Sequence, residues 1–506
     1  MALKRRTLLQ AAGLLSAPLS LRRAFAADES HLTIAYPVDV PSWDAVAHTF
    51  PLAMPIFKSV YDSPLTYTPE LKLAPNVMTA WQLGADGKTI EVTFRDGVTF
   101  HNGDPLTAAD FRFSFLERQK ADPKLPTAGI WRKIDDIEVT SPTQAVVRLS
   151  APMPTAPQWW GFLGSFILPK RYFETVGHDG FLAKPVGSGP YRLVEYQQNA
   201  RIVLEANPKY WGGAPKIARV TIEVVKDPTA RVAAVEAGRA DITKQIPVRE
   251  ALRLGRTQGL AGRVDPITDI IIIQIANKGA FTDPNVRLAA HHAIDKAAIS
   301  KAFFNGAAKP ISVLAPPGTP GDVPGFSFPY SVDQAKALLA KSGFGPQKPV
   351  KIAFNTTNGA FASDYDMARA IASMWQQVGI DADLKVIELA QYYELNHSGK
   401  MPEATLYAGW GNDTADPEIY TGYILNPKLQ FSTWKSDDLA PIIDKLFAET
   451  DYDKRIAGYR DLNRMVVEKG YAMPLLQGVT TVAYRGDVAY TPYGNGWLLP
   501  SALARR

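Results

Sequence analysis

The residues best suited to binding chemistry lie in the segment 406–417, which reads LYAGWGNDTADP. An apolar run ends at Trp410, which stands between two glycines, and Asp413 and Asp416 follow shortly after it. The glycines let the backbone turn, and the Asp-Pro pair is typical of a loop. An aromatic ring and carboxylates at the end of a strand can hold a ligand in an α/β protein. An ordinary loop with a core tryptophan and solvated acids is the alternative interpretation.

Other patterns that could carry catalysis or metal binding are weak. The seven histidines include no HExxH spacing, and His291 and His292 are neighbours that point to different sides of a helix. Residues 187–189 (GSG) fit neither a nucleophile elbow nor a phosphate loop, and we predict a tight turn there. The acid pairs at 135–136 and 437–438 would suit a secreted glycoside hydrolase, although adjacent acids on loops are usually solvated. We therefore predict that the protein has no cofactor and no resident metal and is not an enzyme. A secreted hydrolase with paired carboxylates is the alternative from another functional class.

Aromatic residues are concentrated in or beside the predicted loops, where their rings could enclose a small ligand. Each of them also has the alternative of packing in the core or in a lid. The tryptophans of this set are Trp43, Trp131, Trp159, Trp160, Trp410 and Trp497, with Tyr36, Tyr407 and Tyr493 near them.

The first 26 residues are predicted to be an export signal. Lys4, Arg5 and Arg6 precede a mildly apolar stretch, and residues 24–26 (AFA) form a small-x-small cleavage site. The Arg5-Arg6 pair before an apolar run is similar to a twin-arginine signal, and we expect cleavage after Ala26.

Without the predicted signal, the mature chain has no net formal charge from its Lys, Arg, Asp and Glu residues. The sequence holds 55 Lys and Arg and 50 Asp and Glu residues, and because five basic and no acidic residues lie in 1–26, the remainder carries 50 of each. This balance gives no support to nucleic-acid binding. The absence of cysteine excludes disulfides and a lipid-anchored N-terminal cysteine, so we expect a freely soluble periplasmic protein. No apolar run long enough to span a membrane follows the signal.

The hydrophobic pattern predicts strands and helices in alternation, and therefore an α/β protein. We find no internal repeat. Expected strands are 31–36, 89–94, 145–149, 220–225, 270–275, 350–354, 381–389 and 471–482. Expected helices are 107–119, 228–238, 284–299, 331–343, 363–378, 439–447 and 454–469, with a proline-rich loop at 310–329.

The order of these segments resembles that of the extracytoplasmic solute-binding proteins of family 5, which serve peptide and nickel ABC importers. The most specific similarity is residues 84–103 (GADGKTIEVTFRDGVTFHNG), with further matches at 187–191 (GSGPY), 207–211 (NPKYW) and 236–242 (EAGRADI). The resemblance covers essentially the whole mature chain.

The resemblance implies a fold of the periplasmic binding protein type II kind, in which two lobes joined by a two-strand hinge close over a ligand. Lobe I would comprise 27–50, 161–267 and 478–506, with an extra strand-rich subdomain at 51–160. Lobe II would comprise 268–477. The two crossings would lie at 266–275 and 474–482.

The resemblance also gives the opening segment a role. In dipeptide- and oligopeptide-binding members an Asp three residues after a Trp pairs with the peptide ammonium, and Trp410 and Asp413 have that spacing. Dipeptide binders use an arginine for the ligand carboxylate in the loop that here reads 355–362, where Asn358 stands near the matching place. Asparagine cannot form a bidentate clamp, which argues against a simple dipeptide ligand.

The function implied is that of a periplasmic substrate-binding component of an ABC importer for peptides or related amine-containing solutes. Its partners would be the ligand, a membrane permease and its ATPase, and the protein itself is expected to be a monomer that is not inserted in the membrane. A nickel-complex or oligosaccharide carrier is the alternative within the family. The candidate ligand-binding residues are Asp413, Trp410, Asn412, Tyr407, Tyr36, Trp43, Trp131, Asn358 and Tyr493.

Overall fold

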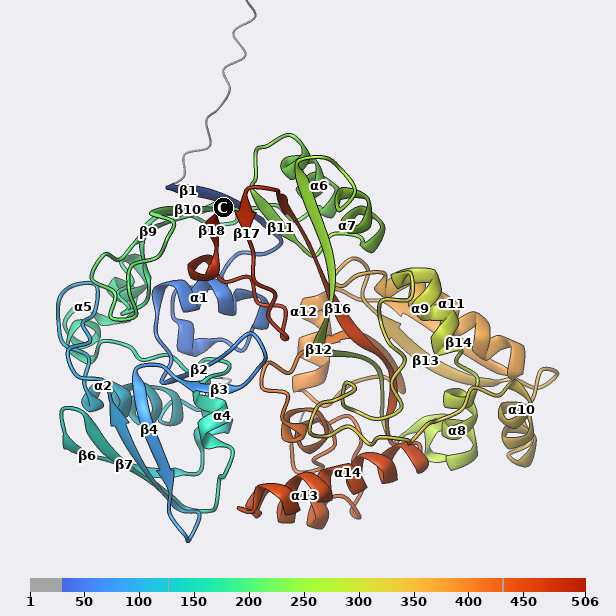
Figure 1. Ribbon diagram of the computed structural model, residues 1–506. Coiled ribbons are helices and arrows are strands. Elements are labelled where there is room, and N and C mark those ends of the chain that lie inside the picture. Colours follow the sequence, from blue (N-terminus) through green and yellow to red (C-terminus); the bar gives the residue numbers. More distant parts are fainter. Residues whose placement is uncertain (1–29, 126, 430–431) are drawn as a thin grey trace, which may run out of the picture.

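The structure is a computed structural model that describes residues 30–125, 127–429 and 432–506 (Figure 1). The predicted export signal, residues 1–26, lies outside the described residues. No helix in the described ranges is long and apolar enough to cross a membrane.

A ten-stranded mixed sheet organises the chain, in the order β14-β13-β15-β12-β16-β11-β1-β10-β9-β8. We call β11, β1, β10, β9 and β8 the first half of the sheet, and β15, β13 and β14 the second half. Their bounds are β1 (His31–Tyr36), β8 (Tyr191–Gln197), β9 (Arg201–Ala206), β10 (Arg219–Val224), β11 (Ile242–Lys244), β12 (Leu260–Ile275), β13 (Val350–Thr356), β14 (Ile380–Val386), β15 (Ala404–Trp410) and β16 (Met473–Arg485).

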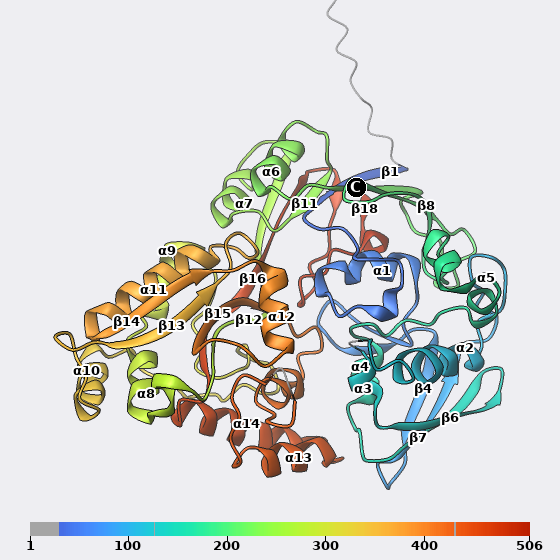
Figure 2. The same cartoon turned by 180° about the vertical axis from the view of Figure 1, so that it is seen from behind.

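Two long strands, β12 and β16, connect the halves. They pair antiparallel with each other, while β16 also pairs with β11 of the first half and β12 with β15 of the second. Figures 1 and 2 show the two halves on either side of these central strands. The crossings expected at 266–275 and 474–482 fall on β12 and β16, and the lobe boundaries given above stay predictions.

Helices cover each half and bury a separate apolar core. The core of the first half centres on β1 and β10, and that of the second half on the isoleucine run of β12. With the first half lie α1 (Met54–Val60), α5 (Lys170–Ala183), α6 (Pro228–Glu236) and α7 (Val248–Leu254). With the second half lie α8 (Pro284–His292), α9 (Lys296–Phe304), α10 (Val332–Lys341), α11 (Asp364–Val378), α12 (Leu389–His397), α13 (Ala440–Ala448) and α14 (Tyr452–Glu468).

A third apolar core belongs to a strand-rich part, residues 65–160, which lies at the lower left in Figure 1. Its four-stranded sheet has the order β4-β5-β7-β6, and the strand predicted at 89–94 is confirmed as β5, which forms a hairpin with β4. The elements are β2 (Leu65–Tyr67), β3 (Leu73–Pro75), β4 (Met78–Leu83), β5 (Thr89–Phe94), β6 (Ile134–Ser141), β7 (Gln144–Leu149), α2 (Ala108–Arg112), α3 (Ala128–Trp131) and α4 (Ala156–Trp160). Outside this part, β17 (Val488–Ala489) and β18 (Ala504–Arg505) form a short pair.

Side chains cap the starts of three helices. Thr107 and Asp110 form a capping box, the Asp227 side chain accepts from the Ala230 N–H, and the Ser331 hydroxyl accepts from the Gln334 N–H. Such caps satisfy N–H groups that a helix start leaves free, which is why short sequence signals locate them well.

Three element predictions are wrong in their extent. The helix expected over 284–299 is two helices, α8 and α9, because the Asp295 side chain accepts from the Ala298 N–H and starts a new helix. The helix expected over 107–119 becomes π-helical from Phe113 to Lys120. The strand expected over 381–389 ends at Val386, and α12 follows, which the sequence pattern did not predict.

The tight turn predicted at 187–189 (GSG) is absent; this segment instead has a packing role, since its backbone lies against the end of α1. The Gly189 N–H donates to the Val60 carbonyl over 2.9 Å, and a Cβ added at Gly187 would stand 2.0 Å from that same oxygen. A side chain at Gly187 therefore collides with main chain, which cannot rotate away.

We expect Gly187→Ala to lower the free energy of unfolding by about 3 kcal/mol because α1 must shift to admit the methyl group. Gly129→Ala is the matched control, since no atom lies within 4 Å of a Cβ placed there inside α3, and it should stabilise by about 0.5–1 kcal/mol. Chemical denaturation measures both. Equal midpoints for Gly187→Ala and the wild type would contradict the packing role.

Candidate functional site

A cleft of about 1860 Å³ lies between the two halves of the sheet and takes its walls from both. The first half contributes Tyr36 at the end of β1 and Lys244 at the end of β11, together with Trp497 from the C-terminal segment. Across the cleft lie Asp413, which follows β15, and the loop 357–363, which follows β13. The edge where strands end thus supplies the site, as is common for α/β sheets.

Asp413 is buried in this cleft, with only 3% of its surface exposed. One carboxylate oxygen, Oδ2, accepts a hydrogen bond from Trp497 Nε1 over 3.0 Å. Burial and, to a smaller extent, the negative charge of Asp269 raise the pKa of Asp413, while Trp497, Lys58 and Lys244 lower it, and the net value is about 8. The carboxylate is therefore short of positive charge, which is what a ligand cation would supply.

Asp269 stands beside Asp413 because of the strand register. Ile270 of β12 pairs with Trp410 of β15. Asp269, which precedes Ile270, therefore lies close to residues 411–413, which follow Trp410. The Asn412 N–H donates to the Asp269 carboxylate. Burial raises the pKa of Asp269 to about 6, against the lowering effect of Lys244. The site thus contains two neighbouring acids, of which the sequence indicated one.

Two lysines offset this negative charge. Lys244 donates from Nζ to the Gly496 carbonyl over 2.7 Å and lines the cleft. Lys58 donates to the Ser63 hydroxyl over 2.9 Å and places its Nζ 4.8 Å from the centre of the Trp497 ring. Burial lowers the pKa of each lysine to about 8, although Asp413 raises both.

Aromatic rings form the wall next to Asp413. Phe361 and Tyr407 meet edge to face with centroids 5.1 Å apart, and Tyr407 stacks on Tyr392 at 4.3 Å. Phe361 lies so close over Gly409 that a Cβ there would be 2.2 Å from the ring, so this glycine makes room for the aromatic wall. The wall is apolar and fixed, which suits the enclosure of a ligand.

The loop 357–363 is fixed by Asp364 at the start of α11. Its carboxylate accepts from the Thr357 hydroxyl over 2.7 Å, the Gly359 N–H over 2.9 Å and the Phe361 N–H over 3.1 Å. Asn358 lines the cleft from this loop.

Four of the nine predicted ligand-binding residues line the cleft, namely Asp413, Tyr407, Tyr36 and Asn358. The other five do not line it in the part of the chain that the structure describes; they are Trp410, Asn412, Trp43, Trp131 and Tyr493.

The packing of those five residues explains their positions. Trp410 lies against Tyr407 at 6.1 Å, and Tyr493 lies 6.4 Å from Trp497, so each is behind a residue that faces the cleft. Trp43 and Trp131 belong to apolar cores, and Trp131 Nε1 donates to Gln119. Asn412 is fully buried and donates to the Asp416 carbonyl over 2.7 Å.

Sequence reasoning missed Asp269 and Lys244 as site residues, and it named Trp497 only as a loop aromatic. Asp269 precedes an apolar run and Lys244 ends a short strand, so neither has a local signal. Only the pairing of β12 with β15, and of β11 with β16, brings them to Asp413.

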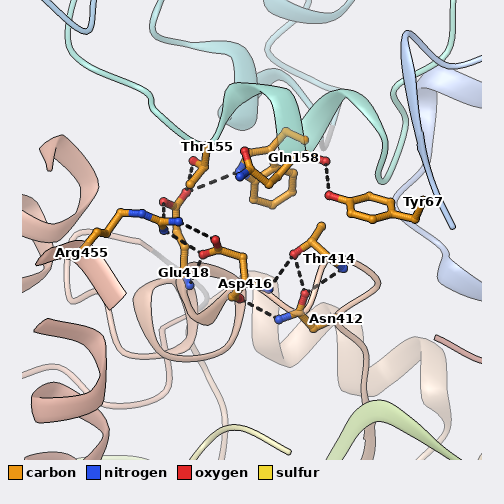
Figure 3. A network of polar contacts seen from close by, with 9 residues as sticks. Tyr67, Thr155, Gln158, Asn412, Thr414, Asp416, Glu418 and Arg455 are labelled. Atoms are coloured by element: carbon orange, nitrogen blue, oxygen red, sulfur yellow. Dashed lines mark hydrogen bonds and ion pairs between the residues drawn. The ribbon is translucent and has the colours of Figure 1, made fainter. Parts of the chain in front are cut away.

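The chain after Asp413 is held by a buried ion pair (Figure 3). Arg455 of α14 donates to both Asp416 oxygens, over 2.8 and 2.6 Å, and lies 3.9 Å from Glu418. Asp416 also accepts from the Glu418 N–H over 3.0 Å. Asp416 is therefore an ion-pair residue in addition to forming the Asp-Pro turn.

Glu418 carries this network across to the strand-rich part. Its Oε1 accepts from the Thr155 hydroxyl over 2.8 Å and from Trp159 Nε1 over 3.5 Å. Burial raises the pKa of Glu418 to about 7, and Asp416 adds to the rise while Arg455 opposes it. The next residue, Ile419, packs into the core of the strand-rich part, so the segment that positions Asp413 also contacts the opposite side of the molecule.

We expect Arg455→Met to lower the free energy of unfolding by about 3–5 kcal/mol, since it leaves the Asp416 carboxylate buried without its partner. Arg148→Met is the control, because the Arg148–Glu138 pair is half exposed, and it should cost less than about 1 kcal/mol. Urea denaturation compares the two, and similar losses for both would refute the assignment of a buried, structurally required pair.

Among the described residues, no group of three or more His, Cys, Asp or Glu side chains is arranged to hold a metal ion. The acid pairs at 135–136 and 437–438 lie away from the cleft lining, and Asp136 and Asp438 pair with Arg112 and Lys469.

Comparisons with known proteins agree with this architecture. Residues 72–430 match the family described as "Bacterial extracellular solute-binding proteins, family 5 Middle". The chain is 26% identical to the nickel-binding periplasmic protein of Escherichia coli (strain K12), over 92% of this chain and 93% of that one. It is also 26% identical to di/tripeptide-binding protein 2 of Pseudomonas aeruginosa (strain UCBPP-PA14), over 82% and 83%.

Among solved structures, the periplasmic binding protein DppA from Helicobacter pylori, in complex with the peptide STSA, superposes with a TM-score of 0.83. It is 22% identical in sequence, and the match covers 94% of this chain and 98% of that chain. The predicted fold class is confirmed by this similarity of architecture.

Proposed function

We propose that this chain, which belongs to family 5 of the bacterial extracellular solute-binding proteins, captures solutes that bear an ammonium group and holds that group at Asp413. As a family member it is the non-catalytic substrate-binding protein of an ABC importer. The alternative of a secreted hydrolase is thereby set aside.

The observation that carries the proposal is the charge state of the cleft. Asp413 and Asp269 are buried together, and repulsion between their negative charges makes it unfavourable for both to be ionised. The positive charges of Lys58 and Lys244 offset this repulsion only in part. A ligand ammonium beside Asp413 forms a charge-assisted hydrogen bond and reduces the repulsion between the acids. Ligand binding thus has a direct electrostatic gain at this point of the cleft.

Lobe closure is the second part of the proposal. Asp413 lies beyond β15, whereas Trp497, Lys58 and Lys244 approach it from the opposite side of β12 and β16. A ligand that touches both sides favours the closed arrangement over an open one, and β12 and β16 are the expected hinge. We further propose that the protein acts in the periplasm as a monomer and delivers its ligand to a membrane permease driven by an ATPase.

A nickel-complex carrier remains the second candidate, supported by the similarity to the nickel-binding relative. The cleft offers few groups of its own to coordinate a metal, so such a metal would have to arrive with its own chelator. Mass spectrometry of small molecules that co-purify with the folded protein distinguishes an amine ligand from a metal complex.

Asp413→Asn is expected to weaken binding of the co-purifying amine at least tenfold, or about 1.4 kcal/mol, because the amide keeps the shape of the carboxylate but not its charge. Without ligand, the same variant should be at least as stable as the wild type, since the amide replaces an acid whose charged form is disfavoured by burial. Titration calorimetry and thermal unfolding provide the two measurements. Asp437→Asn, an exposed acid, is the control and should change neither; unaltered affinity in Asp413→Asn would remove the ammonium anchor.

Affinity for a cationic ligand should rise with pH between about 6 and 8. In the ligand-free protein the pKa of Asp413 is about 8, so below this pH the ligand must displace a proton, and affinity falls by up to tenfold per pH unit. Lys58 and Lys244 lose positive charge as the pH rises toward 8, which reduces their repulsion of a cationic ligand and so also raises affinity. Calorimetry across this range tests the effect, and a flat profile in the wild type would contradict it. Asp413→Asn should show a shallower profile, because only the titration of the other charged groups of the cleft remains.

A further inference from the structure

Lys244 is a buried cation that faces the ligand cleft. It is 5% exposed, stands at the end of β11 and donates one hydrogen bond, to the Gly496 carbonyl. An ammonium group has three N–H donors, so this bond leaves donors available to a ligand. Burial of such a group without a full set of partners is costly, and proteins rarely retain it without a use.

Lys244 is the cleft-lining cation whose charge acts on both acids, although Lys58 has the larger effect on the pKa of Asp413. Asp269 and Asp413 are the two charges that raise its pKa, and it lowers the pKa of each acid in return. Lys58 differs, because it is directed to Ser63 and the Trp497 ring and is not part of the cleft lining. The ligand therefore meets two carboxylates and one ammonium at the same place.

We propose that this cluster recognises an α-amino-acid head group, with an ammonium and a carboxylate on the same carbon atom, and that Lys244 receives the carboxylate. The inference rests on the proposed function, in which Asp413 receives the ammonium. Asp269 is the second acceptor for that ammonium, and Lys244 completes a site of opposite charge for each half of the head group.

The loop at 357–363 supports this assignment. A dipeptide carries its two charges on different residues, whose Cα atoms are about 3.8 Å apart, and its carboxylate needs a cation away from Asp413. The loop contains no basic residue, and Asn358 offers only an uncharged group. Of the other cations in the cleft lining, Arg231 is buried but donates to four backbone carbonyl groups. The rest are exposed and solvated, where an ion pair contributes little; they are Lys226, Arg249, Arg253, Arg256 and Lys301.

The head group has two possible sources, a free amino acid or a larger molecule attached through its side chain. The cleft volume of about 1860 Å³ exceeds what a head group fills, since small-molecule pockets commonly measure about 300–1,000 Å³. The cleft volume therefore favours a larger molecule that carries the head group, and the experiment below tests both this molecule and the free amino acid.

The test uses two isomers, γ-glutamylglycine and α-glutamylglycine, which have the same atoms and the same charges. Only the γ isomer keeps the ammonium and a carboxylate on one carbon. Wild-type protein should bind the γ isomer at least about tenfold more tightly in calorimetry. Lys244→Gln should weaken binding of the γ isomer about tenfold and remove most of the preference for it over the α isomer. The exposed control Lys301→Gln should retain that preference. Free L-glutamate forms the third arm, and binding as tight as that of the γ isomer would identify the free amino acid as the source.

Each other result overturns the inference. A preference for the α isomer, a preference that survives Lys244→Gln, or no binding of the γ isomer at about 1 mM refutes the head-group site. If the α isomer binds best and Asp413→Asn weakens it, the head-group inference fails while the ammonium anchor stands. If Asp413→Asn alters binding of neither isomer, the proposed function fails as well. Thermal unfolding of Lys244→Gln verifies that the variant is folded.

Discussion

The burial of two carboxylates side by side is the constraint on which the site depends. Asp413 and Asp269 come together through the pairing of β12 with β15, and neither charge is fully offset. Each surrounding feature reduces that cost: the Trp497 indole, the Asn412 N–H and the two lysines. Since these groups come from both sides of the central strands, the chain must bring its halves together to keep the acids buried.

The second acid of the motif has a different task from the first. Asp416 is bound by Arg455 through both oxygens, and Glu418 extends the pair to Thr155. The segment between β15 and the π-helix η5 (Glu418–Gly422) is therefore fixed at both its ends. One short run of sequence thus contains a carboxylate that faces the cleft, where we propose that it receives the ligand, and another that holds the backbone. Only their partners distinguish the two.

Local signals in the sequence predicted local structure well. The capping residues Asp227 and Ser331 gave the starts of α6 and α10, because a cap acts on an N–H two or three residues away. The motif around Asp413 was found for a similar reason, since its spacing lies within a few residues. Lys244 and Asp269 were not found, because strand pairing over long distances in the chain decides where they lie. Trp131 shows the same limit: a tryptophan beside a predicted loop can equally fill a core, and neighbours far along the chain decide which.

The position of Trp497 has a consequence for how the protein folds. The indole that donates to Asp413 is separated by most of the chain from Tyr36, which lines the cleft from the same side. Contacts between such distant residues slow folding and leave partly folded chains exposed for longer. A partly folded chain in which Trp497 has not yet docked holds Asp413 without this donor. Ligand can stabilise only the fully folded chain, because a partly folded one has no complete pocket to bind it.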